Sequence, residues 1–85
     1  MGKYRIFIQK SAQKSLARIQ KQDRERIVQV IKGLNSDARP PGSKKLSARD
    51  AWRVRIGAYR VIYEIHDNSF SIQVVVIGKR SEIYR

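Results

Sequence analysis

The chain has 85 residues, which is enough for one domain and too few for two. It carries 19 Lys and Arg against 7 Asp and Glu, a net charge of +12, which indicates a polyanionic partner: nucleic acid, an acidic membrane surface or an acidic protein. It has no cysteine, which excludes a disulfide scaffold, a thiolate zinc site and a cysteine nucleophile and favours the cytoplasm. No segment is apolar enough over enough residues to be a signal peptide or a membrane span.

The first half of the chain predicts one strand and two helices. Residues 4–8 alternate between two faces and form the strand. Ser11 is a candidate N-cap for a first helix, and Asp23 for a second. The apolar positions of the second helix make one stripe: Ile27, Val30, Ile31 and Leu34. Residues 35–43 contain Pro40, Pro41 and Gly42 and are expected to form a loop.

The second half predicts three antiparallel strands, over residues 52–56, 59–66 and 70–77. Gly57-Ala58 is suited to a type II′ turn, and Asp67-Asn68 is a second two-residue turn. These turns pair Ile56 with Tyr59 and His66 with Ser69. The expected fold is therefore α+β: a single domain over residues 1–85, strand-helix-helix-strand-strand-strand, with two helices on one face of a mostly antiparallel sheet.

The predicted register leaves one sheet face apolar and places arginines on the other. Arg53, Arg55 and Arg60 share that face, and Arg55 lies directly across from Arg60. Because like charges opposite each other destabilise a sheet, and because guanidinium groups match phosphate oxygens in pairs, the face is a candidate phosphate-binding surface. A solvated outer face is an equally good interpretation of the pattern alone. Apolar Ile62, Val75 and Ile77 are expected on the same face.

The tail extends the candidate site. Lys79, Arg80 and Tyr84 follow the last strand and are close enough in sequence to cover the arginine face. Tyr84 can stack on an RNA base or donate its hydroxyl proton; a frayed end is the alternative. His66, the single histidine, falls at a turn and is more simply a solvated residue. The acidic residues have no metal-ligand spacing, so neither a metal nor another cofactor is expected.

Several segments of the chain resemble the RelE/ParE toxin superfamily. They are the Lys45-Leu46 pair, the hairpin WRVRIGAYRVIY and the ending GKRSEIYR. The resemblance implies a toxin held inactive by an antitoxin and, for RelE-like members, metal-independent cleavage of messenger RNA on the ribosome. It also implies phosphate-binding catalytic roles for Arg60 and Arg80, and substrate positioning by Tyr84.

At two positions the resemblance breaks down, because Arg53 and Arg55 stand where the best-known member has lysines. Arginine does not lose its proton, so two accounts of the general base remain open. Either electrostatic stabilisation by three or four guanidinium groups supplies most of the catalysis, or a neighbouring group or a ribosomal element takes the proton. The local candidates for that group are Lys44, Lys45, Lys79 and Tyr84. Arg55 is expected to act in catalysis with Arg60, Arg80 and Tyr84, and the RNA-binding residues are expected to be Arg53, Lys44, Lys45 and Lys79. The expected partners are the ribosome, messenger RNA and an antitoxin with an acidic segment that wraps the domain.

Two other functions remain open. A ParE-like inhibitor of DNA gyrase would have the same fold without cleaving RNA. A basic module that binds ribosomal RNA without catalysis would keep the arginines of the sheet but would need no ordered tail.

Overall fold

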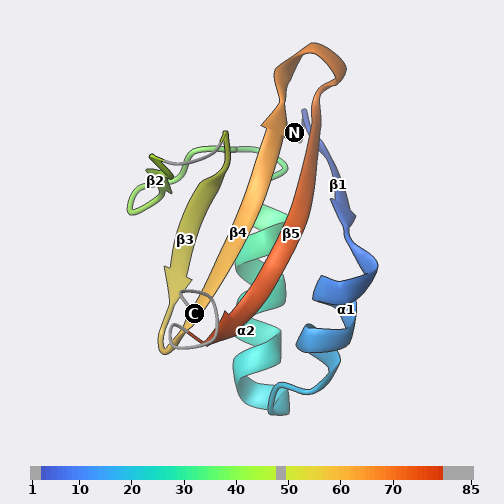
Figure 1. Cartoon of the computed structure of the whole chain (residues 1–85), viewed down its shortest axis with the longest axis vertical. Coiled ribbons are helices and arrows are strands. Elements are labelled where there is room, and N and C mark those ends of the chain that lie inside the picture. Colours follow the sequence, from blue (N-terminus) through green and yellow to red (C-terminus); the bar gives the residue numbers. More distant parts are fainter. Residues whose placement is uncertain (1–2, 48–49, 80–85) are drawn as a thin grey trace.

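The structure, a computed structural model, describes residues 3–47 and 50–79. Five strands form one sheet in the order β1-β5-β4-β3-β2 (Figure 1). β1 runs parallel to β5, and the other neighbouring pairs are antiparallel. The strands are β1 (Arg5–Ile8), β2 (Lys44–Lys45), β3 (Trp52–Ile56), β4 (Tyr59–His66) and β5 (Ser71–Lys79). The expected α+β class is confirmed; β2 was not predicted.

Two helices follow β1 and cover one face of the sheet: α1 (Lys10–Ala17) and α2 (Lys21–Gly33). The predicted caps at Ser11 and Asp23 were wrong, since Gln9 and Gln20 occupy the N-cap positions and neither side chain makes a capping hydrogen bond. The apolar stripe of α2 was placed correctly. It enters one core cluster with α1 and the sheet, whose fully buried large side chains are Tyr63, Ile27, Leu34, Ile72, Val61 and Val74.

The β3–β4 hairpin has the register that the sequence predicts. Ile56 pairs with Tyr59, and Arg55 pairs with Arg60. Gly57 has φ +60° while Ala58 is not in the positive-φ region, as a type II′ turn requires. A glycine is needed here because other residues rarely adopt this conformation.

The β4–β5 connection differs from the prediction. A 3₁₀ turn, η1 (Asp67–Ser69), replaces the two-residue turn, and Phe70 closes it in the left-handed region with φ 48°. His66 therefore pairs with Ser71 instead of Ser69. Taken alone, this two-residue shift leaves the paired strand residues on their expected faces, because side-chain direction repeats every second residue. Phe70, which was expected in the strand, belongs to the turn.

A β-bulge then changes the faces. The register of β4 with β5 shifts between Ile62 and Tyr63, so Ile62 pairs with Val76 and Val61 with Ile77. Ile77 consequently lies in the core cluster, and the expectation that it shares the arginine face was wrong.

In the described part of the chain, no helix is long and apolar enough to cross a membrane.

Candidate nucleic-acid interface

The sheet face opposite the helices gathers basic side chains at the end where the β3–β4 turn lies. Cross-strand pairing makes two adjacent rows on this face: one runs from Lys44 through Arg53 and Ile62 to Val76, and the next from Arg55 through Arg60 to Gly78. We call these seven residues the arginine face. The three arginines expected on one face therefore do share it, and Lys44 joins them.

Arg60 is the most enclosed cation of this face. Its exposed fraction is 4%, and it is the only buried charged residue in the described ranges. Ile62 beside it is equally buried, yet neither belongs to the core cluster on the helix side. Burial restricts the Arg60 side chain, so its guanidinium has few orientations open to it. Gly78, directly across from Arg60 on β5, adds no side chain at that point.

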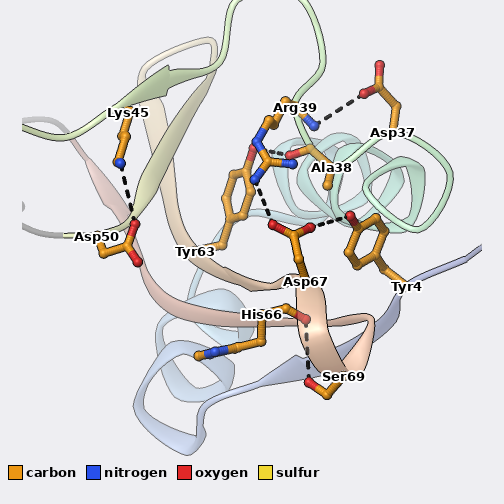
Figure 2. A network of polar contacts seen from close by, with 10 residues as sticks. All are labelled: Tyr4, Asp37, Ala38, Arg39, Lys45, Asp50, Tyr63, His66, Asp67 and Ser69. Carbon is orange, nitrogen blue, oxygen red and sulfur yellow. Dashed lines mark hydrogen bonds and ion pairs between the residues drawn. The ribbon is translucent and has the colours of Figure 1, made fainter.

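The three lysines expected to bind RNA do not lie together. Lys44 pairs with Arg53 and shares its face, whereas Lys45 pairs with Trp52 and Lys79 with Tyr59 on the helix side. Lys45 also forms an ion pair with Asp50, with 3.7 Å between Nζ and Oδ1 (Figure 2). The other predicted tail residues, Arg80 and Tyr84, lie outside the described residues.

Acidic residues are sparse on the arginine side of the sheet. Among the described strand residues of this side, Glu64 is the single acid, and its Oε1 lies 3.3 Å from Nε2 of His66. His66 is exposed at the end of β4, as expected for a solvated residue. Within residues 3–47 and 50–79, no three His, Cys, Asp or Glu side chains gather in a way that could hold a metal ion. The charged groups of the arginine face itself, among the described residues, are the guanidinium groups of Arg53, Arg55 and Arg60 and the ammonium group of Lys44.

A polar network at the opposite end of the sheet was not predicted. The Tyr4 hydroxyl donates a 2.6 Å hydrogen bond to Oδ1 of Asp67, and Arg39 donates a 3.1 Å bond to Oδ2 (Figure 2). The Arg39 guanidinium also lies 5.2 Å from the ring centre of Trp52, and the Tyr63 hydroxyl donates to the Ala38 carbonyl at 2.8 Å. These contacts fasten the loop after α2 to the β4–β5 turn, and no sequence motif marks them.

Three groups in this network have shifted pKa values. The hydrogen bonds from Tyr4 and then Arg39 lower the pKa of Asp67 below its ordinary value, since both stabilise the carboxylate. The same bond to Asp67 raises the pKa of the Tyr4 hydroxyl. Burial raises the pKa of Tyr63. All three groups lie away from the arginine face, so they contribute to the fold and not to that site.

Comparison with models of protein families assigns the chain to a family. Residues 3–84 match the family model described as the ParE toxin of the type II toxin–antitoxin system parDE. The chain belongs to this toxin family. The expected membership of the RelE/ParE superfamily is thus confirmed. No curated protein sequence matches the toxin.

Solved structures share the toxin's fold. The archaeal RelE–RelB complex of Pyrococcus horikoshii contains a chain with 27% identity and a TM-score of 0.83, covering 92% of this chain and 96% of that one. Isolated RelE of E. coli has 23% identity and a TM-score of 0.79, with coverages of 95% and 90%. The RelB–RelE complex of Methanococcus jannaschii contains a chain with 22% identity and a TM-score of 0.73, and the match covers 92% of this chain and 94% of that one.

Proposed function

We propose that this toxin is a ribosome-dependent endonuclease that cleaves messenger RNA. The observation that carries the proposal is the buried Arg60 guanidinium, which lies across from Arg55 and beside the side-chain-free Gly78. Such an arrangement offers a preorganised cation with a second cation next to it, and guanidinium groups match phosphate oxygens in pairs. We further propose that residues 1–85 form one toxin domain. Because ribosomes and messenger RNA lie in the cytoplasm, we propose that the toxin acts there.

The proposed reaction needs no external nucleophile. The 2′-hydroxyl of the message attacks the adjacent phosphorus, the new 2′-O–P bond forms, and the bond from phosphorus to the 5′-oxygen breaks. The 2′-hydroxyl gives up a proton, and the departing 5′-oxygen gains one. Arg55, Arg60 and Arg80 stabilise the negative charge that develops on the phosphate oxygens, and Tyr84 positions the RNA by stacking on a base. Arg53 and Lys44 bind the neighbouring backbone.

Among the residues that the structure describes, Lys44 is the candidate for the proton acceptor on the arginine face. The arginines cannot take the role because a guanidinium stays protonated. Lys45 is one residue away on the other face and ion-paired, so it provides a comparison. Lys44→Gln should slow single-turnover cleavage more than Lys45→Gln. Equal cleavage rates for the two variants would remove Lys44 from this role.

The arginines give the main test of the proposal. Arg60→Ala and Arg80→Ala should each lower the single-turnover rate on programmed ribosomes by about 10²-fold or more, as loss of a preorganised charge donor does elsewhere. Arg5→Ala is the control, because Arg5 is an exposed strand arginine opposite Ser71 at the far edge of the sheet. Thermal unfolding of Arg60→Ala separates a catalytic loss from a folding loss. Wild-type rates in both variants would contradict the assignment.

The products test the route. We expect a 2′,3′-cyclic phosphate and a free 5′-hydroxyl, without a metal ion acting at the protein. Because ribosomes require magnesium, the ends of the products are more informative than removing the metal. A 5′-phosphate with a plain 3′-hydroxyl would indicate a metal-activated water instead.

Inhibition of DNA gyrase is the second candidate, favoured by the ParE description of the matching family model. A supercoiling assay with purified gyrase, run beside the ribosome assay, separates the two functions. Loss of supercoiling with intact message would support the second candidate.

The proposed partner is an antitoxin that carries an acidic, partly apolar segment. The +12 charge would steer an acidic segment to the toxin, and the arginine face offers Ile62 and Val76 for apolar contact. The RelE–RelB complexes among the related structures support such a partner. Association should slow as salt is added; a rate independent of salt would count against this partner chemistry.

A further inference from the structure

A small recess lies on the helix side of the sheet, at the end where β5 finishes. It has a volume of about 260 Å³, room for several water molecules at about 30 Å³ each. It lies between the end of α1 and the paired ends of β4 and β5. The described residues lining it are Ser15, Arg18, Ile19, Tyr59, Ile77, Gly78 and Lys79.

Two cations of the recess have no counter-ion among the described residues. No hydrogen bond or ion pair joins the side chain of Arg18 or Lys79 to another group in the described ranges, and the same holds for the Tyr59 hydroxyl. The described lining residues include no carboxylate. Two free cations and a free hydroxyl donor around one hollow form a site for an anion, because a guanidinium, an ammonium and a phenol can all donate to the same oxygens.

The end of α1 explains only part of this arrangement. Arg18 is the C-cap of α1, where a positive charge interacts favourably with the helix dipole. That effect accounts for a basic residue at position 18, but not for Lys79 arriving from β5 or Tyr59 from β4. Because the carbonyl end of a helix repels anions, a bound anion must be held by the side chains of the recess.

We propose that this recess binds a backbone phosphate of RNA. The inference rests on the proposed function, since it adds a second phosphate site to the same toxin. Successive residues of a strand lie on opposite faces of the sheet. The Tyr59–Lys79 pair therefore lies on the helix side, and the next pair along β4 and β5, Arg60–Gly78, lies on the arginine face. The arginine face and the recess are thus back to back at one end of the sheet. An RNA strand that passes over this end can place one phosphate on each side.

Binding to a short 2′-O-methyl RNA, which lacks the nucleophile for cleavage, tests the recess separately from catalysis. Arg18→Gln and Lys79→Gln should each weaken binding about two- to fivefold at low salt, as expected for exposed charge pairs. Together they should reduce the slope of log affinity against log salt by about 0.7, the value for one phosphate on a single strand. Tyr59→Phe should weaken binding without changing that slope, because no charge is lost.

Lys14→Gln is the matched control. Lys14 is an exposed cation on α1 outside the recess, so it removes the same charge from the same helix. The titration is repeated with vacant ribosomes, so that a loss seen only there identifies the phosphate as ribosomal, and a loss with the short RNA identifies it as that of the message. If Arg18→Gln and Lys79→Gln match Lys14→Gln with both probes, the recess is not a phosphate site.

The proposed function can fail without this inference. If the wild-type toxin leaves the message intact while the recess variants still lose RNA affinity, the recess stands and cleavage is refuted. If the wild type cleaves and the variants bind as the control does, cleavage stands and the recess is refuted.

Discussion

The pairing of Arg55 with Arg60 should make the sheet less stable than it would be with an uncharged side chain at position 55. These residues lie directly across from each other on β3 and β4. Arg60 is 4% exposed, so water screens this pair less than it screens two surface charges. Arg55→Gln keeps a polar side chain of similar length at an exposed position and removes one of the two charges. We therefore expect the variant to be more stable than the wild type.

The size of the effect follows from cross-strand pairs. Like charges directly opposite on a sheet cost about 0.2–1 kcal/mol. For a domain of this length, 1 kcal/mol shifts the melting temperature by about 4–8 °C, so the expected gain is about 1–8 °C at low salt. Salt at 1 M shortens the Debye length to about 3 Å, so the gain should shrink as salt is added, although less than it would for two surface charges.

Melting curves at low and high sodium chloride test this expectation. Lys14→Gln is the control for a general decrease in net charge, because it removes one exposed cation that has no cation paired across a strand. Arg55→Gln should also slow cleavage of the message on programmed ribosomes. Equal melting temperatures for wild type and Arg55→Gln at both salt concentrations, with undiminished cleavage, would show that the arginine face is ordinary solvated surface.

Two further predictions concern the network at the other end of the sheet. Tyr63→Phe removes the buried donor to the Ala38 carbonyl and should lower the free energy of unfolding in urea by about 1–2 kcal/mol, whereas Tyr59→Phe should leave it unchanged; equal effects would contradict the role of the bond. The lowered pKa of Asp67 means that the unfolded chain binds this proton first as pH falls, so stability present above the ordinary carboxyl pKa of 3.8 should be lost below it. Unfolding curves at about pH 6 and about pH 3 should show a smaller acid loss in Asp67→Asn and in Tyr4→Phe than in the wild type; the same loss in all three would exclude the network as its cause.

The part of the site on the β3–β4 hairpin could be predicted because its turn is encoded locally. Gly57 permits the positive φ of a type II′ turn, and the strict alternation from Trp52 to Ile56 allows a single register. Once that register is set, Arg55 must lie across from Arg60. The helix starts were less predictable, because Ser11 and Asp23 are good caps in isolation but the N-cap positions lie two and three residues earlier, at Gln9 and Gln20.

The lysines of the site could not be placed without strand pairing. Lys44 and Lys45 are adjacent in sequence and chemically alike, and the two-residue strand β2 sends them to opposite faces. That strand follows directly after the predicted loop of residues 35–43, and no alternating pattern in the sequence predicts it. Lys79 was expected beside the arginine face, but it is the last residue of β5 and pairs with Tyr59 on the other side. Because Lys79 lies on the helix side, it lines the recess together with Tyr59.

The bulge in β5 has the greatest consequence for the site, and the sequence does not reveal it. Val74, Val75, Val76 and Ile77 are all apolar and β-branched, so alternation cannot show which of them face the core. The predicted two-residue turn would place Val75 across from Arg60, and the observed turn without a bulge would place Ile77 there. The additional one-residue shift brings Gly78 to that position. A branched side chain at that position would lie beside the Arg60 guanidinium, where we propose that a phosphate binds. The proposed site therefore depends on a register that is set three residues away along β4, between Ile62 and Tyr63.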